Sequence, residues 1–219
     1  GSSITVADAD GIIINDGGTM KTIPASDLKT FTASSLDGLS DAKVAGTNFT
    51  GSMFIGIDNS GGTLNSAEYN LGVGTIALDA ITSGDDNTAL GYNALTGLTT
   101  GSKNVAVGKD AMASGTVTGS RNMAVGYNAL NQITSGGGNV AIGGQVLSAL
   151  TDGTKNVGIG RMAGIDNASG SAGTNAITTG DFNTYIGAEA DPSNADAQNE
   201  TVIGYGTTGK GNNTVTIGN

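Results

Sequence analysis

The chain of 219 residues contains no cysteine, no histidine and no tryptophan, and it has only two prolines. The missing cysteines exclude disulfides. Without cysteine and histidine, Ser-His-Asp and Cys-His catalytic groups and the usual zinc and haem ligands are excluded as well. We therefore expect no cofactor and no metal, and we predict that the protein is not an enzyme.

Positive charge and long apolar runs are also scarce. The net charge is −10, with 9 basic and 19 acidic residues. Nucleic-acid binding needs a basic stripe, so no nucleic-acid partner is expected. No apolar run approaches the roughly 18 residues needed to cross a bilayer, so we predict no membrane span.

What the sequence does contain is a repeated motif of the form Gly-x-x-Asn-x-small-aliphatic-Gly. The motif asparagines are Asn70, Asn87, Asn104, Asn122, Asn139, Asn156 and Asn183, and all but the last step between them are nearly equal. The period is about 17 residues, which is too short for one unit to enclose its own core, so each repeat must be buried by the next. The period predicts a solenoid.

The residues within one repeat predict that the solenoid is made of β-structure. The segment Val105–Val107 is typical: β-branched residues flank a small one, which favours a strand. The glycines recur at the same positions of each repeat, as expected of residues in turns. A second apolar patch, Ala94–Leu95 in one repeat, follows each turn, and we expect it to form a second strand, giving a flattened β-roll.

Departures from the period divide the chain. The step from Asn156 to Asn183 is longer than the others, which predicts an insertion loop near 164–180 in a β-roll shaft spanning 70–219. We expect a transition strand within 51–69 and a connector over 1–50. In the connector, residues 15–18 predict a β-hairpin turn, residues 24–31 predict a short helix, and 40–51 is interpreted as a linker.

Composition also bears on assembly. Aromatic residues make up only 4% of the chain, and a thin coil of small residues has little interior. Such a chain gains stability by sharing burial with neighbouring copies. We predict a homotrimeric fibre, with or without intertwined chains, and leave open end-to-end assembly of trimers.

The repeated asparagine is predicted to be structural, because stacked Asn side chains hydrogen-bond to one another and to adjacent turns along a β-stack. Tyr92 and Tyr127 occupy equivalent positions, each followed by Asn-Ala-Leu. They predict an outer aromatic column. Simple surface packing is the favoured interpretation of this column, and contact with a sugar or a protein partner is the alternative that makes Tyr92 and Tyr127 candidate site residues.

Acidic residues are the remaining candidates for chemistry, since two carboxylates can hydrolyse a glycosidic bond. The candidates are Asp8, Asp10, Asp85, Asp86, Glu189, Asp191 and Asp196. Most lie in turn contexts, where Asp binds its own backbone, and we predict that turn role. A carbohydrate-active tailspike is kept as an alternative.

Three segments carry a family resemblance: Asn87–Leu95, Asn122–Leu130 and Asn213–Asn219. They resemble the repeats of bacteriophage tail fibres, and are similar to the β-roll heads of trimeric autotransporter adhesins. Two upstream segments, Gly18–Lys29 and Thr47–Ser52, resemble the upstream parts of phage fibres.

The resemblance implies a structural protein of the virion, located outside the cell. It would be a tail fibre or receptor-binding fibre shaft that attaches to a glycan or protein of the host surface. The alternative that it leaves open is the head of a bacterial trimeric surface adhesin.

Overall fold

The computed structural model describes residues 66–165 and 176–218, and the strands at 11–16, 19–24, 42–44 and 53–55. These parts contain strands, turns and bends and no helix, so the described chain is all-β. They also include no helix of the length and apolarity that a membrane crossing requires.

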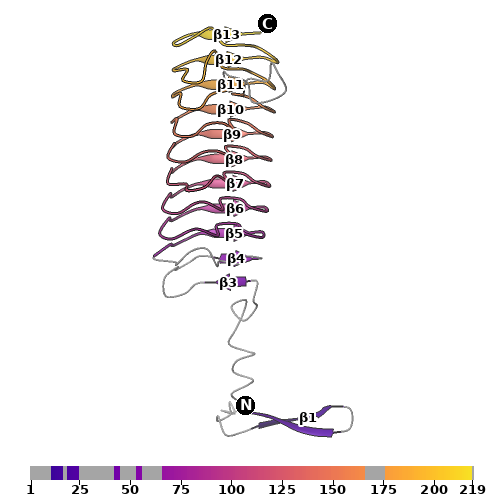
Figure 1. Ribbon diagram of the computed structural model, residues 1–219. Helices are drawn as coiled ribbons and strands as arrows, with labels where there is room; N and C mark the ends of the chain where they lie inside the picture. Colours follow the sequence, from indigo (N-terminus) through magenta and orange to yellow (C-terminus); the bar gives the residue numbers. More distant parts are fainter. Residues whose placement is uncertain are drawn as a thin grey trace, which may run out of the picture.

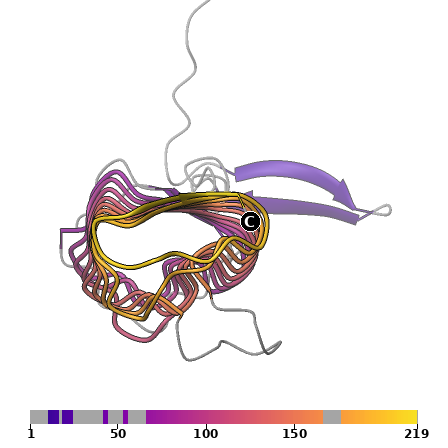
Figure 2. The same cartoon turned by 90° about the horizontal axis from the view of Figure 1, so that it is seen from above.

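The shaft is a parallel β-solenoid, as the repeat period predicts. Short strands stack in chain order in one sheet (Figure 1), and successive coils superpose on one elongated outline when seen from above (Figure 2). All neighbours pair in parallel except β3 and β4, which are antiparallel. The strands are β3 (Ala42–Val44), β4 (Met53–Ile55), β5 (Leu71–Val73), β6 (Thr88–Leu90), β7 (Val105–Val107), β8 (Met123–Val125), β9 (Val140–Ile142), β10 (Val157–Ile159), β11 (Thr184–Ile186), β12 (Thr201–Ile203) and β13 (Val215–Ile217).

The strand register follows the sequence repeat, and it holds where the repeat length changes. Val157 of β10 pairs with Thr184 of β11 across the long step. Thr201 of β12 pairs with Val215 of β13 across a step that is shorter than the others. Within the long step, Ile165 and Ala176 flank residues 166–175 and belong to one small buried cluster. Most of the predicted insertion, 166–175, lies outside the described residues.

From β5 to β12, each strand turns its middle residue into the coil and its two flanking side chains outward. The buried middle residues of β5 to β12 are Gly72, Ala89, Ala106, Ala124, Ala141, Gly158, Tyr185 and Val202. Across the interior they meet a wall of buried side chains: Leu78, Leu95, Met112, Leu130, Leu147, Ile81, Leu98, Ile133, Leu150 and Ile177. The core is therefore one continuous column that runs through the stacked coils between the strands and this wall.

The outward side chains of the strands form a surface that we call the aliphatic face. Its first row is Leu71, Thr88, Val105, Met123, Val140, Val157, Thr184, Thr201 and Val215. Its second row is Val73, Leu90, Val107, Val125, Ile142, Ile159, Ile186, Ile203 and Ile217. None of these side chains is buried. The face carries no charge.

The second strand expected in each repeat is wrong for the described coils. Residues 91–97, which include the patch Ala94–Leu95, form consecutive turns. Leu95 has a φ of 52°, a left-handed conformation that no extended strand can contain. Its N–H still donates to the carbonyl of Ala111 on the next coil, at 3.0 Å. The patch is apolar because it is buried, and its backbone forms turns that bring the chain round to complete the coil.

The upper end of the column has a buried polar pair. Glu200 lies one repeat after Asn183 and is fully buried. Its carboxylate accepts hydrogen bonds from the Gly211 N–H at 2.9 Å and the Tyr185 hydroxyl at 3.4 Å. Burial raises the pKa of Tyr185 far above its usual value, and the charge of Glu200 and its hydrogen bond add to this rise. On the coil below, the strand partner of Tyr185 is Gly158, which has no side chain to compete for the space.

Upstream, β1 (Gly11–Asp16) and β2 (Thr19–Pro24) pair as antiparallel strands. The predicted turn includes residues 17 and 18, which lie outside the described residues. Of the predicted helix 24–31, Pro24 is the last residue of β2, and 25–31 lies outside the described residues. β3 falls within the stretch 40–51 that was interpreted as a linker, and it belongs to the same sheet as the shaft. This finding corrects the linker interpretation at residues 42–44.

Candidate surface site on the tyrosine column

The two predicted contact residues occupy one column on the outside of the solenoid, directly after the glycine that ends each strand. Tyr92 follows Gly91 on one coil, Lys109 follows Gly108 on the next, and Tyr127 comes on the third. A Cβ at Gly108 would lie 2.7 Å from the carbonyl oxygen of the next coil's glycine. Glycine therefore lets the coils approach closely, which keeps the column in register.

Lys109 is the residue between the two tyrosines. Its Nζ lies 5.8 Å from the ring centroid of Tyr92 and 5.9 Å from that of Tyr127. The two tyrosines are 51% and 52% exposed, so about half of each is open to a ligand. Cation–π contacts at exposed sites contribute about 0.5–1 kcal/mol each, enough to favour this arrangement of the side chains.

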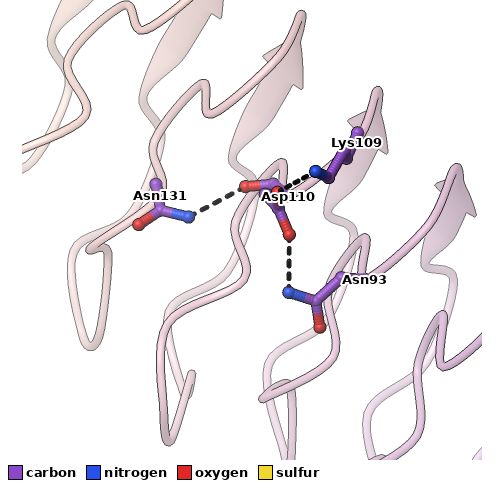
Figure 3. Close-up of polar contacts among 4 residues, drawn as sticks. All are labelled: Asn93, Lys109, Asp110 and Asn131. Atoms are coloured by element: carbon purple, nitrogen blue, oxygen red, sulfur yellow. Dashed lines mark hydrogen bonds and ion pairs between the residues drawn. The ribbon is translucent and has the colours of Figure 1, made fainter.

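Asp110 connects the column to the turns beside it (Figure 3). Its carboxylate accepts a hydrogen bond from Asn93 Nδ2 at 2.7 Å and lies 3.7 Å from Lys109 Nζ. Its backbone carbonyl accepts from Asn131 Nδ2 at 3.0 Å. The site thus combines two aromatic faces, an ammonium, a carboxylate and amide groups. Such a mixture suits binding of a sugar or a peptide surface.

The sequence pointed to the tyrosines and missed the polar residues around them. Lys109 stands one repeat after Tyr92 and one repeat before Tyr127, so it shares their phase. Asn93 and Asp110 occupy the next position of the repeat, directly after Tyr92 and Lys109. Comparing the residues at every equivalent position of the repeat, and not only the tyrosines, would have identified Lys109, Asn93 and Asp110.

The repeated asparagines lie inside the solenoid. Asn104 is typical of them: it is fully buried, and its Nδ2 donates to Gly119 O at 2.9 Å and to Asn87 Oδ1 at 3.1 Å. Its Oδ1 accepts from the N–H of Asn122 at 2.9 Å and from Asn122 Nδ2 at 3.3 Å. Both donors and both acceptor positions of the amide are used. The ladder thus stabilises the stack and leaves no group for a ligand.

The ladder continues from Asn70 to Asn183. At its first step Asn87 donates to Asn70 Oδ1, and at its last the N–H of Glu200 donates to Asn183 Oδ1 at 2.8 Å. Between those ends, each asparagine also donates to a backbone carbonyl on the next coil.

The candidate acidic residues that the structure describes lie in coil-to-coil hydrogen bonds, an ion pair, a bridge or turns. Asp85 accepts the N–H of Glu68 at 2.8 Å, and Asp86 is a left-handed residue with a φ of 59°. Glu189 forms an ion pair with Arg161. Asp191 forms a parallel bridge with Thr208, and Asp196 lies in a turn. Asp8 and Asp10 lie outside the described residues. In the part of the chain that the structure describes, no three acidic residues group as they would around a metal ion.

Comparisons with known proteins add no assignment: no family model, curated protein or solved structure matches this chain.

Proposed function

We propose that this chain is the shaft of a homotrimeric fibre that attaches a virion to its host, as a phage tail fibre or receptor-binding fibre. In this proposal the protein is outside the cell, its first partner is itself, and its second is a glycan or protein of the host surface. The observation that carries the proposal is the uncharged, outward-facing aliphatic face of a straight stack of coils.

The size of that face supports a role in assembly. The strands β5 to β13 at about 4.8 Å spacing give a length of roughly 40 Å, and the short strands give a width of about 10 Å. The resulting area, on the order of 400 Å², is in the range at which exposed apolar patches mark interaction sites. Ile142 and Ile159, in the middle of the second row, remain 39% and 38% exposed.

A second copy of the chain is the natural partner for such a surface. Copies share one coil spacing, so the ridges of one aliphatic face can fit between those of another along the whole shaft. Three faces meeting at one axis would bury both rows without exposing a hydrophobic edge. The tyrosine column, which follows the strands at a turn, would stay on the outside to meet the host.

The proposal is tested by charging the aliphatic face. In the double variant Ile142→Asp and Ile159→Asp, two carboxylates on adjacent coils would have to enter the apolar interface of each chain. We expect sedimentation velocity to show a trimer of the 21.4-kDa chain for the native protein and a monomer for the variant.

The matched control is Gln132→Asp, which adds a carboxylate at an exposed turn position away from this face. It should remain trimeric. A native protein that is monomeric at micromolar concentration, or a double variant that still forms trimers, would rule out the aliphatic face as the interface.

The head of a bacterial trimeric surface adhesin is the second candidate. It is favoured by the final coil, which is shorter than the others and still closes, so that β12 and β13 pair in parallel. The length of this final step is the one common among the repeats of such adhesins. A gene that continues into a coiled-coil stalk and a membrane anchor would decide for the adhesin.

A further inference from the structure

A second hydrogen-bond ladder precedes the asparagine ladder at the corner where each coil enters the sheet. Here a backbone N–H on one coil donates to a side-chain oxygen of the next. Asp85 N donates to Ser102 Oγ, and Ser102 N donates to Ser120 Oγ, both at 3.0 Å. Higher in the stack, Thr154 N donates to Asp181 Oδ1 at 2.6 Å.

The ladder is interrupted at Gly137, which has no side chain to offer an oxygen. The N–H of Ser120 therefore lacks the acceptor that its equivalents on the coils below possess. The N–H of Gly137 is also without an acceptor in the described part of the chain. Two backbone donors on adjacent coils are thus left for a ligand or for water.

The position directly after the ladder residue is basic on several coils, and it too is occupied by a glycine on the coil of Gly137. Lys103, Arg121 and Lys155 are exposed left-handed residues, with φ between 56° and 63°. Gly138 takes the corresponding place between Arg121 and Lys155, with a φ of 72°. These two basic residues are two coils apart, roughly 10 Å, with no side chain between them.

The two interruptions together form a hollow of about 360 Å³. It is lined by Ser120, Arg121, Ser135, Gly137, Gly138, Thr154 and Lys155. The residues that line the hollow therefore include two basic residues, the two glycine and serine N–H donors described above, and three residues with hydroxyl groups.

The cations of this hollow are not neutralised by the protein. Elsewhere Lys109 lies beside Asp110, and Arg161 pairs with Glu189. Neither Arg121 nor Lys155 forms an ion pair in the described coils. Lys155 Nζ lies 5.0 Å from the ring centroid of Phe182, a cation–π contact with the next coil that leaves the ammonium without a carboxylate partner. This cationic spot is unusual in a chain of net charge −10.

The nearby carboxylate of Asp181 is bound to another group. Its Oδ1 accepts both the N–H and the hydroxyl of Thr154, at 2.6 Å and 2.9 Å. It therefore belongs to the ladder rather than to either basic side chain.

We propose that this hollow binds an oxyanion substituent, a sulfate, phosphate or carboxylate, of a polysaccharide on the host surface. Backbone N–H groups in a concave turn bind anions, and charge-assisted hydrogen bonds from guanidinium and ammonium groups strengthen that binding. The open mouth leaves room for the sugar that carries the anion. The inference rests on the proposed attachment function and names the ligand class for it.

The test is fluorescence anisotropy of a labelled sulfated tetrasaccharide, titrated with the purified full chain in its native assembly. We expect saturable binding that sodium sulfate displaces and sodium chloride of equal ionic strength does not. Arg121→Gln and Lys155→Gln should each weaken binding about two- to fivefold, as expected for exposed charges. Arg161→Gln removes the same charge from another column and should have no effect.

Gly137→Ser is the sharpest variant. It would supply the missing ladder oxygen to the Ser120 N–H, as Ser120 and Ser102 do on the coils below. The new Cβ would lie 3.0 Å from the Ser120 carbonyl oxygen, so a small backbone shift is required. We expect unchanged thermal stability and a loss of sulfate-competed binding. Saturable binding of equal strength in this variant would overturn the proposal.

Three further probes identify the source of the anion: a phosphorylated, a uronate-bearing and a neutral tetrasaccharide of the same length. The neutral probe should not bind, and binding of it as tight as that of the charged probes would contradict the proposal. None of these results depends on the aliphatic face. Sedimentation of the same variants therefore shows separately whether the trimeric fibre is correct.

Discussion

Replacing Asn104 with aspartate changes a single buried group and should strongly destabilise the solenoid. The wild-type amide makes four hydrogen bonds, two as donor and two as acceptor. Ionised aspartate can only accept. Its oxygen would face Gly119 O and Asn87 Oδ1, which now receive donated hydrogens at 2.9 Å and 3.1 Å.

The magnitude follows from these lost donors. A buried acceptor left without a donor costs about 1–3 kcal/mol, and a buried charge without a counter-ion adds to that. We expect Asn104→Asp to lower the free energy of unfolding by about 4 kcal/mol per chain near pH 7. Guanidinium denaturation followed by circular dichroism measures it.

The cost should decrease at low pH. Burial and the two facing oxygens raise the pKa of the introduced carboxyl in the folded state, although the two donors of Asn122 oppose this. A group whose pKa is higher in the folded protein than in the unfolded chain stabilises the fold at a pH below its pKa in the unfolded chain. This contribution is lost as the pH rises through its pKa in the folded protein. The deficit relative to wild type should therefore be smaller near pH 4 than near pH 7.

Asn128→Asp is the matched control. Asn128 is a half-buried, left-handed residue with a φ of 56°, a conformation that aspartate also tolerates. No hydrogen bond from its side chain supports the described stack. A cost for Asn104→Asp no larger than that of the control, or one independent of pH, would refute the ladder argument.

Other predictions concern the coil contacts, the buried tyrosine and the contact column. Gly126→Ala should cost about 3 kcal/mol or more of unfolding free energy, because its Cβ would lie 2.3 Å from the Gly143 carbonyl oxygen; a cost near zero in the denaturation assay would contradict the packing. Since burial raises the pKa of Tyr185, its stabilising effect is present below about pH 10 and decreases as the pH rises further. An absorbance titration should show one tyrosine that ionises only on unfolding, a phase that Tyr185→Phe removes. Tyr92→Ala and Tyr127→Ala should each weaken attachment to host cells without changing the sedimentation of the trimer, and unchanged attachment in both would remove the column from the contact surface.

The repeat itself could be predicted from the sequence because one structural unit recurs at one length. Each motif places an inward residue such as Ala106 between two outward ones, so a parallel stack follows from the period. The register across the long step could also be anticipated, since the glycine, asparagine and aliphatic-Gly positions of the motif resume at Gly180, Asn183 and Ile186–Gly187.

The wall opposite the strands could not be predicted in the same way. Leu95 and its equivalents are apolar in either conformation, and apolarity indicates burial rather than backbone angles. Nothing in their residue types signals a left-handed φ, which the closure of the coil imposes. Glu200 was also missed because the motif leads one to expect asparagine there, whereas its longer side chain reaches the N–H of Gly211.

The proposed binding hollow was missed for a different reason. The run Gly136–Gly138 looks like an ordinary turn when read along the chain. Its meaning appears only when each residue is compared with its equivalents one coil below and one coil above. There, Gly137 replaces a ladder serine and Gly138 replaces a basic residue.

The most direct test of the whole account is a cryo-electron microscopy map of the native assembly. The account predicts a straight three-fold particle with coils about 4.8 Å apart, in which both rows of the aliphatic face, including Ile142 and Ile159, point to the axis and Tyr92 and Tyr127 face solvent. A monomeric particle, or an assembly in which the aliphatic face is turned to solvent, would contradict it.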